Sequence, residues 1–167
     1  MTTIRTIRQD DAAMFLSLRK QLDTETNFML LEPGERKTNE ETLRQQLNNI
    51  LIQDNATLLV AEDDGMLVGF IAADGGFFRR NYHTAKVVIG LLISHQRMGL
   101  GTQLFEKIEE WAKDHQIHRL ELMVMEHNQA AIGLYQKMGF AVEGIKRDNL
   151  LINGEWINEL LMAKILG

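Results

Sequence analysis

The sequence predicts an α/β fold with one mixed central sheet of about six to seven strands, flanked on both faces by about four helices. Three observations indicate it. Asp63-Asp64-Gly65 and Asn153-Gly154 each separate two strand-like runs, which is typical of antiparallel hairpins. Residues 84–125 follow the order strand, glycine-rich turn, amphipathic helix, strand. A crossover of this kind places two parallel strands side by side, so the sheet is expected to contain both arrangements.

The first half of the chain is expected to contain a strand, two helices and a hairpin. Residues 3–8 alternate between two faces, as a strand does, and Asp10 or Asp11 is expected to cap the helix that follows. Thr38 and Glu41 have the spacing of a capping box, which predicts a second helix from there to about residue 53. The hairpin strands are expected at 57–62 and 66–73.

The second half is expected to add two helices and four strands. A strand at 84–93 leads through the glycine-rich turn into a helix from Thr102 to His115. Gly139 suits the position just beyond the end of the last helix, because glycine readily adopts a left-handed backbone. The remaining elements are expected at 119–125 (strand), 128–138 (helix), 140–152 (strand) and 155–166 (strand).

Composition restricts the possible functions. The 167 residues are expected to form one domain over residues 1–167, and a net charge of −5 argues against a nucleic-acid partner. There are no cysteines, which excludes disulfides, Cys-ligated zinc and a cysteine nucleophile. The five histidines show no His-x-x-x-His pairing, so no metal is expected. No signal-peptide core or long apolar segment is present, which predicts a cytoplasmic protein with no membrane partner.

The glycine-rich turn at 96–102 predicts a site for an anionic small molecule. Gly99 and Gly101 carry no side chain and allow close approach of a ligand. The first turn of the following helix leaves backbone N–H groups without partners, and the helix dipole adds partial positive charge there. Arg97 adds a full charge beside them.

Two nucleotide-binding motifs fit this turn poorly. No Gly-x-x-x-x-Gly-Lys-Ser/Thr run exists, which argues against a P-loop. A dinucleotide fingerprint would require glycine where Leu104 stands. Glu121 lies about 20 residues further on, as that fingerprint requires, but inside its strand rather than at its end.

A second motif extends the pattern. The chain has Gln-x-x-Gly-x-Gly at 96–101 and Asn-x-x-Ala-x-x-Leu-Tyr-x-Lys-x-Gly-Phe at 128–140. Together, in this order, they resemble the GNAT (Gcn5-related) N-acetyltransferase superfamily, and the resemblance covers nearly the whole chain. The superfamily more often has arginine where this chain has Gln96, and Arg97 supplies a charge next to it.

The resemblance implies the GNAT acyl-CoA N-acyltransferase fold and acetyl-CoA as cosubstrate. The diphosphate would lie on the backbone of the turn, and the pantetheine arm along the end of the preceding strand. A backbone N–H near Leu92 or Ile93 would stabilise the thioester oxygen. Asn128 would hold the arm or only cap its helix, and Lys137 would reach the phosphates or only face solvent. The cofactor-binding residues implied in this way are Leu91, Leu92, Ile93, Gln96, Arg97, Met98, Gly99, Leu100, Gly101, Thr102, Asn128, Ala131, Tyr135 and Lys137.

By the same resemblance, a neutral primary amine would attack the thioester directly in a ternary complex. Tyr135 would act as general acid toward the departing thiolate, unless it is only a packed core residue. Glu32 is the first candidate for the base, with His83, Glu126, His127 or a chain of waters as alternatives. The alternative function is a non-catalytic acyl-CoA-binding sensor or interaction module.

The acceptor is not identified by the sequence, and candidates are an amino acid, a protein N-terminus, a polyamine or a similar small amine. The apolar loop 28–35 is expected to form a wall of the acceptor site, or else to pack as core. The segment 77–82 is an exposed tip between two strands, a lip of the acceptor site or a subunit contact. Exposed strand edges would allow a homodimer.

Overall fold

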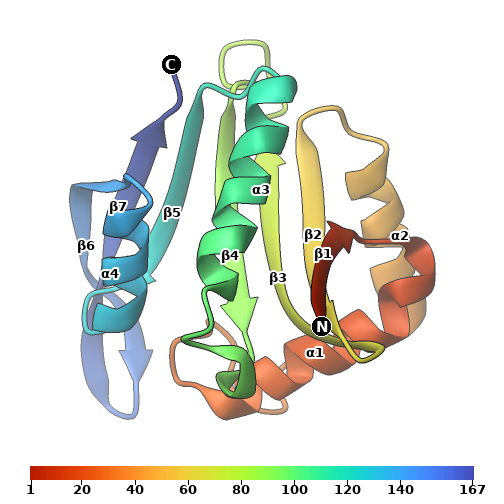
Figure 1. Cartoon of the computed structure of the whole chain (residues 1–167). Helices are drawn as coiled ribbons and strands as arrows, with labels where there is room; N and C mark the ends of the chain where they lie inside the picture. The colour runs from red at the N-terminus through yellow and green to blue at the C-terminus, as the bar shows by residue number, and fades with distance from the viewer.

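The structure, a computed structural model describing residues 1–167, is built on one seven-stranded sheet (Figure 1). The strand order is β1-β2-β3-β4-β5-β7-β6, and every neighbouring pair is antiparallel except β4 and β5. The mixed sheet is therefore confirmed. The strands are β1 Thr2–Thr6, β2 Ala56–Asp63, β3 Met66–Gly75, β4 Thr84–Leu91, β5 Arg119–Met125, β6 Ala141–Ile152 and β7 Glu155–Ile165.

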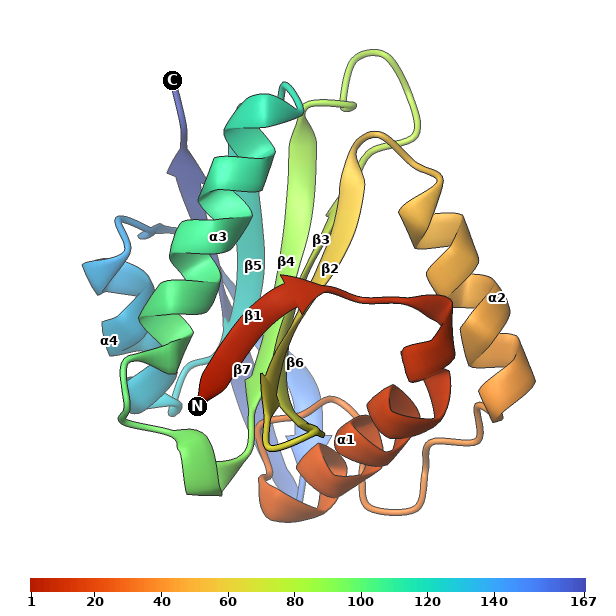
Figure 2. The same cartoon turned by 45° about the vertical axis from the view of Figure 1, so that its right-hand side comes forward.

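Four α-helices cover the sheet, with α1 and α2 on one face and α3 and α4 on the other (Figure 2). They are α1 Ala12–Glu25, α2 Glu40–Leu51, α3 Leu100–Asp114 and α4 Gln129–Lys137. Because successive residues of a strand point to opposite faces, Leu58 packs in the core beneath α1 and α2, and Leu59 packs beneath α3 and α4. No helix is long and apolar enough to traverse a lipid bilayer.

The predicted turns are confirmed by their backbone angles. Asp64 and Gly65 have φ values of 51° and 77°, and Asn153 and Gly154 have 51° and 80°. Two successive positive φ values define the type I′ turn, whose twist matches that of paired strands. Gly139, directly after α4, has φ 95°, as a helix-terminating glycine should.

The predicted start of α2 was wrong by one residue. The N-cap is Asn39, whose Oδ1 accepts a hydrogen bond of 2.8 Å from the Thr42 N–H, so Thr38 and Glu41 do not form a capping box. Asp11 does occupy the residue before α1, but its carboxylate accepts from the Arg8 N–H and from the Arg5 guanidinium rather than from the helix. Both differences arise because several short polar side chains compete for the same few donors.

The junction between β4 and α3 also differs from expectation. The strand ends at Leu91, and residues 93–95 form a short 3₁₀ turn instead of its last residues. The helix starts at Leu100, two residues before the predicted Thr102, because Gly99 adopts a left-handed backbone with φ 79° and acts as its N-cap. The glycine-rich turn is therefore shorter than predicted, and more of it belongs to the helix.

Candidate active site

The two parallel strands of the sheet separate toward their carboxyl ends. β4 and β5 pair only where Thr84–Lys86 lies beside Arg119–Glu121, and beyond that the two ribbons diverge (Figure 1). The Leu92 N–H donates to the Val68 carbonyl of β3. Since backbone groups alternate in direction along a strand, those of Ile89 and Leu91 are turned the other way, toward β5. The diverging strands therefore leave polar backbone groups available between them.

The turn that follows β4 presents a run of unbonded backbone donors. None of the N–H groups from Arg97 to Thr102 has an acceptor in the protein, and the first bond of α3 runs from the Gln103 N–H to the Gly99 carbonyl. Arg97 and Gly99 both have positive φ, at 62° and 79°. Alternation of left- and right-handed residues directs successive N–H groups into one concavity, which favours an anion. The backbone of the turn therefore offers the N–H donors that the predicted anion site requires.

The two glycines of the turn have different roles. A Cβ built on Gly99 would meet nothing within 4 Å, so the space beside it is open to a ligand. A Cβ on Gly101 would lie 2.9 Å from Leu134 Cδ2 of α4. The sequence suggested ligand approach for both residues, whereas Gly101 is buried and permits close packing of α3 on α4. The side chain of Gln96 donates a 3.1 Å hydrogen bond to the Leu91 carbonyl and fixes the turn to the end of β4.

Helix α4 carries the second motif. Asn128 is its N-cap and accepts from the Ala131 N–H at 3.3 Å, which shows the capping role. The Tyr135 ring is only 8% exposed and packs edge-on against Phe105 at 5.6 Å, yet its hydroxyl makes no hydrogen bond in the protein. Burial raises the pKa of Tyr135 to about 12, so the phenol keeps its proton at neutral pH. Lys137 is exposed and unpaired.

Comparison with known proteins identifies the family. The model of the Acetyltransferase (GNAT) family matches residues 19–140. The chain belongs to the GNAT family. An L-amino acid N-acetyltransferase of Escherichia coli K12, AaaT, is 32% identical over 111 residues, which are 64% of this chain and 67% of that protein.

Solved structures of the GNAT family agree with the fold over the full chain. An acetyltransferase of the family from Streptococcus pneumoniae is 30% identical, with a TM-score of 0.95 and complete coverage of both chains. A phosphinothricin acetyltransferase from Sinorhizobium meliloti, solved in complex with acetyl-CoA, has a TM-score of 0.85 at 18% identity and covers 99% of this chain and 89% of that one. The second likeness shows the fold alone.

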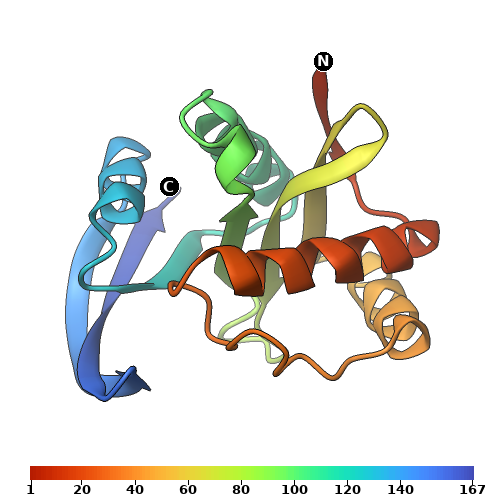
Figure 3. The ribbon, with the colours of Figure 1, turned by 90° about the horizontal axis from the view of Figure 1, so that it is seen from below.

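In this GNAT chain the loop between α1 and α2 lies over the carboxyl ends of the diverging strands (Figure 3). The Phe28 ring stands 5.0 Å from that of His127, just beyond β5. The Met29 methyl would lie 3.3 Å from a Cβ on Gly90, near the end of β4. Phe28 is 39% exposed and Leu30 75%, so the loop covers the strand ends without becoming core. This arrangement favours the acceptor-wall interpretation.

The candidates for the general base differ in their distance from the strand ends and in whether their side chains are already engaged. Glu32 is exposed in the same loop, and its carboxylate makes no hydrogen bond or ion pair. Glu126 follows β5 but accepts a 2.8 Å hydrogen bond from Asn158 Nδ2. His83 precedes β4, and the eight residues that separate it from Leu91 span about 25 Å of extended chain, which removes it from the strand ends. His127 stacks on Phe28.

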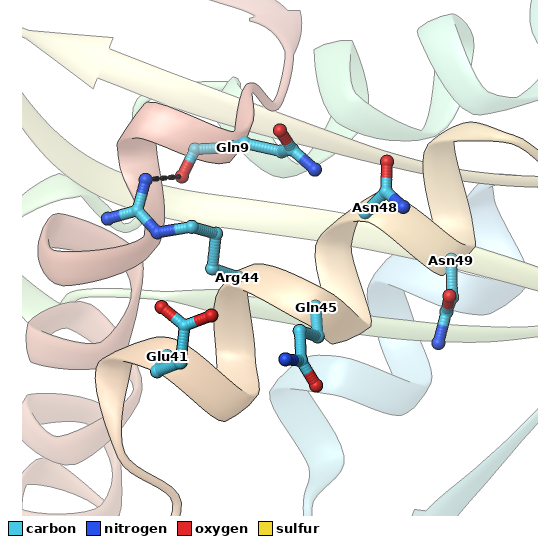
Figure 4. Close-up of a pocket in the computed structure, with 6 residues that line it drawn as sticks. All are labelled: Gln9, Glu41, Arg44, Gln45, Asn48 and Asn49. Atoms are coloured by element: carbon cyan, nitrogen blue, oxygen red, sulfur yellow. Dashed lines mark hydrogen bonds between the residues drawn. The ribbon is translucent and has the colours of Figure 1, made fainter.

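The segment 77–82 joins β3 to β4 at the end of the sheet opposite the glycine-rich turn, so it cannot be a lip of this site. Phe77 and Phe78 are 79% and 74% exposed, which confirms an exposed tip. A polar pocket of about 330 Å³ on α2 also lies outside the site, because it uses no residue of the strand ends or the turn (Figure 4). Its lining is Gln9, Glu41, Arg44, Gln45, Asn48 and Asn49.

One site residue was missed by the sequence analysis. The Glu25 carboxylate, at the end of α1, accepts a 2.9 Å hydrogen bond from the Ile93 N–H, and the Leu92 N–H is bonded to Val68 at 3.0 Å. Neither of these two N–H groups, expected to hold the thioester oxygen, is therefore free. Glu25 and Ile93 are 68 residues apart in the chain, and no local pattern could have revealed the contact.

Proposed function

We propose that this protein is an acetyl-CoA-dependent N-acetyltransferase that acetylates the primary amine of a free amino acid. The observation that carries the proposal is the run of six unbonded N–H groups from Arg97 to Thr102. Such a run suits the diphosphate of coenzyme A, and the open space beside Gly99 leaves room for it. The amino acid as acceptor is supported by the relation to AaaT, an L-amino acid N-acetyltransferase.

The backbone of β4 would bind the acyl arm. The backbone groups of Ile89 and the Leu91 N–H face the space between the diverging strands, where an amide-bearing chain could pair with them as an added strand, while the Leu91 carbonyl accepts from Gln96. One of these N–H groups would then stabilise the thioester oxygen as negative charge develops, in place of the occupied Leu92 and Ile93 donors. Arg97 in the turn and Lys137 at the last residue of α4 are exposed cations, and we propose that both meet the phosphates.

The chemical step needs two proton transfers. The amine nitrogen attacks the thioester carbonyl carbon, the C–S bond breaks, and Tyr135 donates its phenolic proton to the departing sulfur. The proton lost by the amine passes to a base, and an equal proton returns to the Tyr135 phenolate, so the reaction yields an N-acetyl amine and a free thiol. Glu32 stays the predicted base, because its carboxylate is unpaired in the loop over the strand ends.

A charge placed in the turn tests the anion site. Gly99→Asp puts a carboxylate where the diphosphate is expected, and Gly99→Asn is the matched control, since Asn tolerates the same left-handed backbone without the charge. A Cβ at this position meets no neighbour within 4 Å. By calorimetry, the Asp variant should bind coenzyme A about 30-fold or more weakly than the Asn variant, as expected for like charges brought together.

Acetyl transfer is measured as thiol release from acetyl-CoA across a panel of amino acids, with the N-acetyl product identified by mass spectrometry. Release that depends on the amino acid supports the proposal. Tight coenzyme binding with no acceptor-dependent release would instead support an acyl-CoA sensor. Well-folded protein without affinity for coenzyme A would overturn both functions.

A further inference from the structure

Arg19 occupies an unusual place for a cation. It lies on the face of α1 that is turned toward the sheet, between the buried residues Phe15, one turn before it, and Leu22, one turn after it. Its guanidinium carbon is 4.7 Å from the centre of the Phe70 ring of β3 and 5.9 Å from that of Phe15. The aromatic rings stabilise the charge only in part, because a cation–π contact is weaker than an ion pair with a buried carboxylate.

Arg19 has no anionic partner in the protein. It makes no hydrogen bond and no ion pair, and its Nε is shielded from solvent without an acceptor. The carboxylate of Asp23, one turn along α1, is engaged by Arg36 at 2.8 and 3.1 Å. Burial, followed by the like charge of Arg36, lowers the pKa of Arg19 to about 10. By contrast, the other partly buried arginines all have carboxylate partners: one for Arg36, and two each for Arg5, Arg44 and Arg119.

The two terminal nitrogens of Arg19 form no hydrogen bond, and unlike Nε they are not completely shielded from solvent. A planar guanidinium with two free nitrogens on one edge matches the two oxygens of a carboxylate. The stem and Nε of Arg19 are therefore packed against the protein. The two terminal nitrogens are left available to a ligand.

This open edge lies near the proposed reaction centre. Phe70 pairs with Gly90 across β3 and β4, and a Cβ on Gly90 would lie 2.8 Å from the Phe70 ring and 2.9 Å from Leu22. Arg19 is therefore one aromatic ring away from Gly90, the residue that precedes Leu91. Only a glycine at position 90 leaves room for this packing.

We infer that Arg19 binds the carboxylate of the acceptor and so selects amino acids over other amines. The inference rests on the proposed function, because it assigns a residue to the acceptor side of the same site. The bound carboxylate supplies the counter-ion that the partly buried guanidinium lacks. A polyamine would instead bring a second positive charge toward Arg19, and a protein N-terminus would offer a neutral peptide group where the carboxylate is expected.

The test compares an amino acid with its own carboxamide as acceptors. Arg19→Met keeps an apolar stem over Phe70 and removes the charge, and Lys20→Met removes an exposed cation from the next position of the same helix. Wild type and Lys20→Met should prefer the amino acid by about 30-fold or more in kcat/KM, the range seen when one partner of a desolvated charge pair is removed. Arg19→Met should lose that preference through KM for the amino acid, with KM for acetyl-CoA unchanged.

Thermal unfolding separates recognition from a structural role. Removal of an uncompensated charge should raise the Tm of the free Arg19→Met protein, and a saturating amino acid should raise the Tm of wild type but not of the variant. A purely structural arginine predicts a lower Tm and equal losses on both acceptors, and this result would overturn the inference. Arg19→Lys, which keeps the charge without the planar fork, should recover part of the preference and serves if the Met variant does not fold.

The experiments distinguish a failure of the proposed acetyltransferase function from a failure of the Arg19 assignment. If no amine is acetylated, the amino-acid-dependent shift in Tm still tests Arg19, and its absence in wild type as well as in Arg19→Met overturns the inference. If wild type acetylates amino acids and their carboxamides equally well, the proposed acetyltransferase stands and the assignment of Arg19 is wrong.

Discussion

Replacement of Tyr135 by Phe should separate catalysis from folding. The ring is 8% exposed and packs against Phe105 and Phe140, and Phe keeps all of that apolar surface. The hydroxyl forms no hydrogen bond in the protein, so its loss leaves no partner unsatisfied. The free energy of unfolding should therefore change by less than about 1 kcal/mol.

The expected loss of activity follows from the pKa of the phenol. Burial raises the pKa of Tyr135 to about 12, whereas a free thiol has a pKa of about 8.5, so complete proton transfer to the thiolate is uphill by roughly 3.5 units. The phenol therefore assists mainly as charge develops on sulfur. We expect a loss near the lower end of the usual range for a general acid, about 100-fold in kcat, which is about 2.7 kcal/mol.

The pH dependence has a definite sign. Tyr135 acts in its protonated, neutral form, and that form is lost only as pH rises through its raised pKa of about 12. Any fall in kcat between pH 8 and 10 must then come from another group. The Phe variant should show the same profile as wild type over this range, displaced downward by a constant factor.

The assay is thiol release from acetyl-CoA at saturating amino acid, with KM for acetyl-CoA and the urea midpoint measured on the same samples. A kcat within threefold of wild type, for a variant with unchanged stability, would refute the role of Tyr135 as general acid. In that case Tyr135 would be only a packed aromatic residue of the core.

Two further predictions concern stability and packing. Asp11→Asn breaks a buried ion pair with Arg5, whose two nitrogens donate to the carboxylate at 2.8 and 2.9 Å, and should cost about 3 kcal/mol at pH 7 in urea unfolding. The Arg5 hydrogen bond lowers the pKa of the Asp11 carboxyl, so wild type should begin to lose this contribution as pH falls below about 4, and the two proteins should converge only once pH is below the lowered pKa; a constant difference would contradict the assignment. Gly101→Val adds methyl groups against Leu134, where even a Cβ would be 2.9 Å away. It should lower the free energy of unfolding by about 1–3 kcal/mol and weaken coenzyme A binding in calorimetry. Unchanged binding would show that the anion site tolerates movement of α3 against α4.

The features that the sequence predicted correctly depend on short stretches of chain. The hairpin turns need two residues with positive φ, and Asn-Gly and Asp-Gly adopt this backbone with little strain. The parallel pair follows from the handedness of a strand–helix–strand crossover, and the run of unbonded N–H groups follows from a glycine turn before a helix. In each case the residues that decide the structure are neighbours in sequence.

Two causes explain the predictions that were wrong: competition among similar polar residues for one cap, and hydrogen bonds to residues far apart in the chain. Thr38 and Asn39 are both good caps, and the choice of Asn39 depends on how α2 meets the rest of the protein. The occupied N–H groups of Leu92 and Ile93 could not be foreseen, because their partners come from β3 and α1. Two of the backbone donors that the sequence analysis expected to be free are therefore occupied.

The sequence by itself determined the family through two motifs, and the sheet with its crossover and the glycine-rich turn through local backbone preferences. Only the tertiary structure decided which side chains lie near the proposed acceptor site. Arg19 reads in the sequence as an ordinary helix cation, and its significance appears only when α1 packs on the sheet, places the guanidinium over Phe70 and directs the carboxylate of Asp23 to Arg36. Long-range packing fixes whether a charge is compensated, and no local pattern carries that information.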